Sequence, residues 1–277
     1  MERIKWPNGA NNAVMITLDL DAELFAKAYH PDADHEEDDY AIPAKCGLEN
    51  GLPRILDAVE AVGAKVTAFV PGWVAERHPK AVKMLVERGH EVGFRGYAQE
   101  NLGLMDDAEQ EQALLKGFKA VESVSGKTPA GFRAPLGEVT NSTFEIIRKL
   151  GIKYSSTLSD DDVPYYLDLK DGQKMLEIPY LWPLYDMPYF IFHFFPPIPY
   201  GQSRISSFDK VLTNWKWEYD GVFRDGTCYV LQLDPTTAGD PGRIFMLDEL
   251  FAYINKKGNA WFATGSQIHE FMSSSAE

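Results

Sequence analysis

The stretch Ala13-Val14-Met15-Ile16-Thr17-Leu18 runs directly into Asp19-Leu20-Asp21-Ala22-Glu23. Its first part is apolar and partly β-branched, which predicts a strand buried on both faces, as in parallel sheets covered by helices. Asp19 and Asp21 follow with a spacing of two, so their carboxylates share one face of the chain. Because ligands bind at the carboxyl ends of parallel strands, this stretch predicts an α/β fold and places two acids at its candidate site.

Strand-like and helix-like segments alternate along the rest of the chain, which is the pattern of an α/β barrel or an open α/β sheet. The expected strands cover residues 13–18, 65–70, 91–94, 130–133, 154–156, 177–179, 229–233 and 261–264. The expected helices cover residues 51–61, 80–88, 108–124, 141–150, 206–223 and 244–254, with Asn141 as the expected cap of its helix. This gives about seven βα units without a linker, so we expect one domain over residues 1–277.

The charge balance excludes several classes of partner. The chain has 41 acidic residues against 27 Lys and Arg, a formal net charge of −14, which disfavours nucleic acid and anionic membrane surfaces. Cys46 and Cys228 are too few for a disulfide framework. Neither a signal-like start nor a long apolar run is found, so we expect a cytoplasmic protein.

Two segments have an unusual composition. Residues 32–40 are strongly acidic, which favours a solvated loop, with a weak cation site around His30, Asp32 and His35 as the alternative. The segment from Tyr185 to Tyr200 is the densest in aromatic residues. We interpret it as a subunit interface or a loop over the site, and it is the basis for expecting a homo-oligomer.

Polar side chains follow three further expected strands. Arg95 and Gln99 follow one strand, Arg133 precedes Pro135 at another, and Asp234 follows a late one. Two acids on one buried face are costly unless a cation compensates them. The cation is either a metal ion or the pair of arginines.

Taken together, these segments resemble the polysaccharide deacetylase (NodB-homology) family, and in particular the branch that contains peptidoglycan deacetylases and allantoinase-like hydrolases. The matching segments, in chain order, are residues 17–23, 69–76, 90–100, 132–135, 154–156, 160–165, 231–235 and 261–265. The resemblance spans almost the whole chain and rests on the order and spacing of these segments. It implies a distorted (β/α)7 barrel.

The resemblance also implies roles for individual residues. Asp19 matches the catalytic base, Asp21 the acidic metal ligand, and Arg133 the arginine that orients the base. Asp234 stands where the family has a proton-donating histidine, while Arg95 and Gln99 stand where it has the two histidines that bind zinc. We expect five residues to bind substrate: Asp21, Arg95, Gln99, Pro135 and Tyr97. His90 is expected to have a structural role.

These replacements change the expected cofactor. An arginine stays protonated and has no lone pair to give to a metal, and a glutamine offers only a weak carbonyl oxygen. Asp21 with Gln99 lacks the nitrogen ligands that hold zinc. We therefore expect no tightly bound transition metal and no cofactor, and a small molecule or oligosaccharide as ligand.

Three functions fit the sequence. The first is metal-independent hydrolysis of a non-peptide C–N bond, in an N-acyl sugar or a cyclic amide. In it Asp19 activates water, both arginines stabilise the oxyanion, and Asp234 is the acid. Nearby arginines are expected to lower the pKa of Asp234, which argues against that last role. The second is a catalytically inactive protein that binds a carbohydrate or carboxylate ligand, and the third is an oligomeric scaffold.

Overall fold

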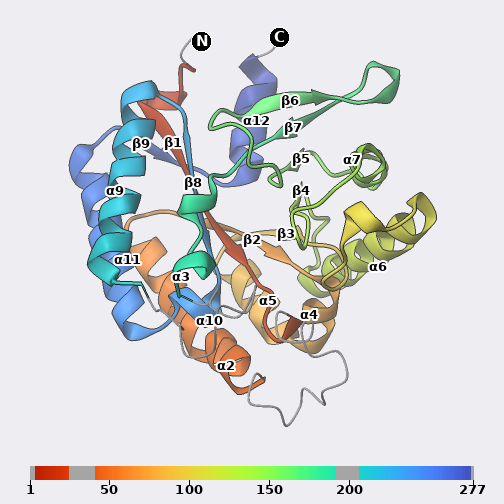
Figure 1. Ribbon diagram of the computed structural model, residues 1–277, viewed down its shortest axis with the longest axis horizontal. Coiled ribbons are helices and arrows are strands. Elements are labelled where there is room, and N and C mark those ends of the chain that lie inside the picture. Colours follow the sequence, from red (N-terminus) through yellow and green to blue (C-terminus); the bar gives the residue numbers. More distant parts are fainter. Residues whose placement is uncertain (1–3, 25–40, 191–205, 276–277) are drawn as a thin grey trace, which may run out of the picture.

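The computed structural model describes residues 4–24, 41–190 and 206–275 (Figure 1). The acidic stretch 32–40, with its alternative cation site, lies outside the described residues. Of the aromatic segment only residues 185–190 are described, so the homo-oligomer stays a prediction. Among the described helices, none is long and apolar enough to cross a bilayer.

The sheet runs in the order β6-β7-β5-β4-β3-β2-β1-β8, and β9 pairs with β1 beside this path. From β7 to β8 the neighbouring strands pair in parallel, and β6 joins β7 as an antiparallel edge. The strands are β1 (Asn12–Asp19), β2 (Val66–Val70), β3 (Glu91–Phe94), β4 (Gly131–Phe132), β5 (Tyr154–Ser155), β6 (Tyr165–Asp168), β7 (Lys174–Glu177), β8 (Cys228–Leu233) and β9 (Ala260–Phe262). Among the described residues, the path from β7 to β8 has seven parallel strands and β9 adds another beside β1, and this curled sheet agrees with the predicted (β/α)7 fold.

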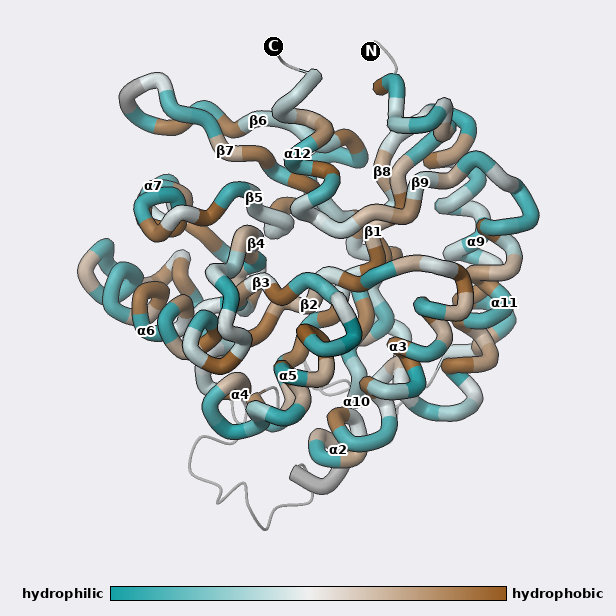
Figure 2. Tube along the Cα trace, turned by 180° about the vertical axis from the view of Figure 1, so that it is seen from behind, coloured by the Kyte–Doolittle hydropathy of each residue, from teal (hydrophilic) through white to brown (hydrophobic). Residues whose placement is uncertain are grey.

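Strand β1 pairs with three strands, β8, β9 and β2, and all eight of its residues are buried. Along one side it pairs with β8, from Ala13 with Cys228 to Leu18 with Leu233. On the other side β9 pairs with its first residues and β2 with its last. Figure 2 shows hydrophobic residues concentrated along β1, β2 and β3, between the helices. This burial on both faces is what the apolar run 13–18 predicts.

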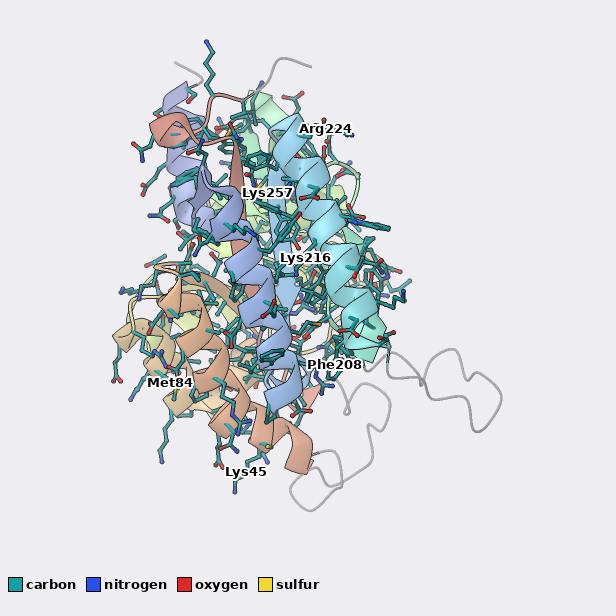
Figure 3. The ribbon with its side chains drawn as sticks, turned by 90° about the vertical axis from the view of Figure 1, so that its left-hand side faces the viewer. Lys45, Met84, Phe208, Lys216, Arg224 and Lys257 are labelled. Atoms are coloured by element: carbon teal, nitrogen blue, oxygen red, sulfur yellow. The ribbon has the colours of Figure 1, made fainter. Side chains whose placement is uncertain are left out.

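Helices cover the outside of the sheet (Figure 1). They are α2 (Ala41–Cys46), α3 (Leu52–Ala61), α4 (Gly72–Arg77), α5 (Pro79–Glu87), α6 (Asp107–Ser125), α7 (Asn141–Lys149), α8 (Met187–Phe190), α9 (Phe208–Asp225), α10 (Pro235–Ala238), α11 (Pro241–Lys257) and α12 (Gly265–Ser275). Short η segments cover Pro7–Gly9, Gly47–Gly51, Leu102–Leu104, Lys170–Gly172 and Trp182–Leu184. Figure 3 shows α9, with Lys216 and Arg224, beside α11, with Lys257.

Three predictions about local structure were wrong. The strand expected at residues 177–179 ends at Glu177, because Pro179 has no N–H for a sheet ladder. Strand β6 was missed, because its short edge segment has a half-buried pattern. Thr140, not Asn141, caps α7: its side chain accepts from the Thr143 N–H, and Thr143 returns a bond to the Thr140 backbone.

Two glycines in the middle of helices test the packing of this scaffold. A Cβ on Gly117 of α6 would lie 2.1 Å from the carbonyl oxygen of Gly96, in the turn that follows β3. Gly117→Ala therefore overpacks that turn, and we expect a loss of about 1–3 kcal/mol in the free energy of unfolding. Gly221 of α9 has nothing within 4 Å of the added atom, so Gly221→Ala should gain about 0.5–1 kcal/mol. Urea unfolding of both variants measures this; equal effects would contradict the packing described.

Candidate functional site

The predicted polar residues meet at the carboxyl ends of the parallel strands. Asp19 ends β1, and Asp21 follows two residues later. Arg95 follows β3, Arg133 follows β4, and Asp234 follows β8. All five side chains are buried, with exposed fractions of 5% or less. The barrel therefore brings three carboxyls and two guanidiniums into one buried cluster.

Arg95 makes four hydrogen bonds within the protein and an ion pair with a second carboxylate. Its Nε donates to Asp21 Oδ1 at 2.9 Å, and one Nη2 donor goes to Asp21 Oδ2 at 3.2 Å. The others reach the carbonyls of Ala134 and Pro135, at 2.9 and 2.7 Å, and Nη1 also lies 3.3 Å from Asp19 Oδ2. Burial disfavours the charged guanidinium, but the two aspartates outweigh it and raise the pKa of Arg95. Four of the five N–H donors of Arg95 are thus in hydrogen bonds to protein oxygens, and Nη1 also forms an ion pair with Asp19.

Arg133 holds Asp19 from the other side. Its Nη1 donates to Asp19 Oδ1 at 3.0 Å and to Thr17 Oγ1 at 2.8 Å. Its Nε and Nη2 donate to the carbonyl and hydroxyl oxygens of Ser156, at 2.7 and 2.8 Å. The guanidinium carbon lies 4.4 Å from the centre of the Phe69 ring, which adds a cation–π contact. This agrees with the orienting role that the resemblance implies.

Asp19 is completely enclosed. Besides its two arginines it accepts a hydrogen bond from Gln232 Nε2, at 2.6 Å from its Oδ2. Its exposed fraction is 0%. Both of its oxygens therefore contact protein donors.

The other substrate-binding candidates are divided between the cluster and its edge. The Gln99 side chain hydrogen-bonds Asp21, and Pro135 contributes only its carbonyl oxygen, to Arg95. Tyr97 points elsewhere: its hydroxyl donates to Glu76 Oε2 at 3.1 Å, and its ring packs under Lys116.

The pKa of Asp234 is shifted in the opposite direction from the one predicted. Burial, followed by the negative charge of Asp21, raises its pKa to about 7. The prediction of a lowered pKa was wrong because the hydrogen bonds of both arginines go to Asp19, Asp21 and protein oxygens, none to Asp234. Its Oδ1 accepts from the Thr236 N–H at 2.7 Å and caps α10.

Sequence reasoning missed four residues of this cluster. Thr17 and Gln232 each lie two positions before a predicted acid, so strand periodicity could have found them. Ser156 lies at the end of β5 and could have been found as Arg133 was. Asp186 has no comparable signal, because it lies in a loop, and only the fold brings it beside β8: its Oδ2 accepts from the Asp234 N–H at 3.0 Å.

Two further residues lie away from the cluster. Both carboxylate oxygens of Glu23 lie 2.8 Å from His78 Nε2. Burial raises the pKa of Glu23, but the hydrogen bond to His78 and the nearby charges lower it below its usual value. His90 lies at the amino end of β3, where its Nδ1 accepts from the Val66 N–H at 3.2 Å and burial lowers its pKa to about 4. This placement suits the structural role expected of His90.

The zinc ion that the family implies does not fit these residues. Both oxygens of Asp21 accept from the Arg95 guanidinium, which has no lone pair and would repel a dication. In the part of the chain that the structure describes, no three His, Cys, Asp or Glu side chains form a group that could hold a metal ion. The donor set is that of an ion-pair network.

The raised pKa of Asp234 predicts a specific pH dependence of stability. The folded state keeps the proton up to about pH 7, while the unfolded chain loses it near the usual value of 3.8. This acid therefore contributes stability at low pH that is lost as the pH rises to 7, up to about 4 kcal/mol. Asp234→Asn cannot titrate, so its free energy of unfolding relative to the wild type should rise from about pH 4 to about pH 7. Urea unfolding across this range measures it, with the exposed Asp168→Asn as control; parallel curves for wild type and Asp234→Asn would contradict the burial argument.

The sequence of this chain is similar to those of known deacetylases. The sequence profile described as polysaccharide deacetylase matches residues 38–155. The chain is 31% identical to the peptidoglycan deacetylase of Helicobacter pylori over 245 residues, which is 79% of this chain and 83% of the relative.

Solved structures of similar proteins superpose on this chain over nearly its whole length. A Mycobacterium smegmatis protein assigned to the polysaccharide deacetylases superposes with a TM-score of 0.92 at 32% identity, over 100% of this chain and 95% of that one. The Puue allantoinase, at 21% identity and a TM-score of 0.82 over 98% and 93% of the two chains, shares the fold. The barrel, the order of its motifs and these relatives show that the chain belongs to the polysaccharide deacetylase family.

Proposed function

We propose that this chain is a carbohydrate-binding member of its family that does not perform metal-dependent deacetylation. One observation carries the proposal: the Arg95 guanidinium binds both oxygens of Asp21 and also donates to the carbonyls of Ala134 and Pro135. A side chain thus supplies the positive charge that a metal supplies elsewhere in the family. Such a charge cannot polarise a bound water as a metal ion does.

The environment of Asp19 supports the same conclusion. A general base must come within hydrogen-bond reach of the proton that it removes. Arg133, Arg95 and Gln232 contact the two oxygens of Asp19, so neither oxygen lacks a protein donor. Access to Asp19 would require breaking ion pairs in a buried network, which is costly.

A carbohydrate ligand is the choice that the relatives favour, because their names describe deacetylases of polysaccharides and peptidoglycan. Two large apolar side chains beyond strand ends on this side of the barrel remain accessible: Leu136 is 48% and Trp182 is 49% exposed. Apolar and aromatic surfaces of this kind can pack against sugar rings.

One observation favours a second candidate, metal-independent hydrolysis of an N-acyl sugar or a cyclic amide. A buried carboxyl with a pKa of about 7, as Asp234 has, can donate a proton to a leaving nitrogen at neutral pH. Arg95 contributes little to this candidate, since its hydrogen bonds hold Asp21 and the carbonyls of Ala134 and Pro135. A strained cyclic amide needs the least help and is the substrate class that this candidate favours.

A combined binding and turnover measurement tests the proposal. The full chain is mixed with N-acetylglucosamine and glucosamine oligomers, with allantoin and with a cyclic imide, each with added zinc and with a chelator. We expect an oligosaccharide to bind, and no product to form, under both conditions. Zinc-dependent acetate release would overturn the proposal, and chelator-resistant turnover that Asp234→Asn abolishes would establish the second candidate instead.

The ion-pair interpretation also predicts how a metal site can be created. Replacing both residues, Arg95→His with Gln99→His, removes the guanidinium and adds two nitrogen ligands beside Asp21. The double variant should bind about one zinc per chain, since two histidines and a carboxylate form a zinc ligand set. Zinc content after dialysis measures this. Arg95→Met with Gln99→Met is the control without ligands, and equal zinc in the wild type and the double variant would contradict the interpretation.

A further inference from the structure

A second acidic group lies beside the ion-pair network. Asp186 is bound along β8 by two hydrogen bonds: its N–H donates to the Gln232 carbonyl at 3.2 Å, and its Oδ2 accepts from the Asp234 N–H at 3.0 Å. Tyr185, one residue earlier, forms a parallel bridge with Gln232. This segment therefore extends the barrel wall at β8 and places Asp186 next to Asp234.

The buried charges in this region do not balance. Four carboxyls lie here with exposed fractions of 4% or less, those of Asp19, Asp21, Asp186 and Asp234. The guanidiniums of Arg95 and Arg133 form their ion pairs with Asp19 and Asp21. On α11, Arg243 attracts Asp186, but its hydrogen bonds go to the Thr237 carbonyl and to Asp240. Asp186 and Asp234 thus have no ion pair with any described residue, so they must carry protons or meet a cation.

Two buried oxygens at this place have no partner in the described part of the chain. They are Gln232 Oε1 and Asp186 Oδ1. The Gln232 side chain extends into the cluster, because its Nε2 donates to Asp19, and its exposed fraction is 3%. An unsatisfied buried acceptor costs free energy, so these oxygens favour a ligand that donates hydrogen bonds.

Unpartnered acceptor oxygens and excess negative charge favour a ligand that donates hydrogen bonds and carries a positive charge. An ammonium group has three N–H donors, no acceptor and a positive charge. A metal ion is the weaker match, because no three acidic, His or Cys side chains among the described residues are grouped to hold one. The net charge of −14 further attracts cations to the crevice.

We propose that the acids Asp186 and Asp234, with Gln232 Oε1, form a subsite for a free ammonium group, so that the crevice prefers an amino sugar to its N-acetylated form. The proposal rests on the proposed function, carbohydrate binding at this crevice. It replaces the carboxylate ligand that the sequence left open, because the ion pairs of Arg95 and Arg133 go to Asp19 and Asp21.

Binding should release protons. Burial, followed by the neighbouring negative charges, raises the pKa of Asp186 well above its usual range and that of Asp234 to about 7. Asp19 and Asp21 face these acids from β1, and Arg243 from α11. An ammonium group that takes the place of a proton leaves the carboxyl ionised, so at neutral pH the proton moves to the buffer.

Isothermal titration calorimetry tests the subsite, with the glucosamine tetramer and the N-acetylglucosamine tetramer as probes and a chelator present. The wild type should bind the glucosamine tetramer at least about tenfold more tightly, the effect of one charge-assisted hydrogen bond. Its binding enthalpy should vary with the ionisation enthalpy of the buffer. Asp186→Asn and Asp234→Asn should each remove most of the preference, while Asp168→Asn, at an exposed site, should keep it.

The outcomes separate the two proposals. Binding of neither tetramer overturns carbohydrate binding and the subsite together. Equal binding of both, or tighter binding of the acetylated one, overturns the subsite alone. The buffer dependence is measured on the wild type, so it decides even if a variant fails to fold, and its absence counts against the subsite. If calcium or magnesium abolishes tetramer binding in a titration without chelator, the subsite holds a metal ion and the ammonium assignment is wrong.

Discussion

The bidentate ion pair between Arg95 and Asp21 is the contact on which the arrangement of the strand ends depends. It joins the end of β1 to the end of β3, and the carbonyls of Ala134 and Pro135 extend it to the loop after β4. All its members are buried, so removing one partner would leave an uncompensated charge, at a cost of about 3–5 kcal/mol. The positive charge at this point of the barrel is thus that of a protein side chain, the Arg95 guanidinium.

A guanidinium differs from a divalent metal ion in charge and in direction. It carries one positive charge where a zinc ion carries two, and its five donors lie in one plane. Arg95 therefore satisfies Asp21 and nearby carbonyls but leaves less positive charge for the acids farther along the wall. Burial, followed by the negative charges of neighbouring acids, raises the pKa of both Asp186 and Asp234. No arginine hydrogen bond to either side chain offsets these effects among the described residues.

The sequence predicted the parts of the site that strand geometry decides. The spacing of two placed Asp19 and Asp21 together, and the strand ends at Arg95, Arg133 and Asp234 predicted the remaining members of the cluster. It could not predict Asp186, because a loop residue reaches β8 only through the path of the chain around the barrel. The prediction of a lowered Asp234 pKa was wrong, since the sequence places arginines near this acid but shows neither its burial nor which acids accept their hydrogen bonds.

Under the proposed exchange of a metal for a guanidinium, residues 95 and 99 depend on each other. With histidine at position 95 alone, Asp21 loses its ion pair, and the glutamine at 99 supplies no nitrogen ligand in return. With histidine at position 99 alone, the guanidinium still occupies both oxygens of Asp21. The first single change removes the ion pair without completing a metal site, whereas the second keeps the ion pair and so keeps a metal away from Asp21; we expect only the first to lower the free energy of unfolding. At 32% identity and a TM-score of 0.92 to a relative, the scaffold is kept, and a few side chains at the strand ends decide its chemistry.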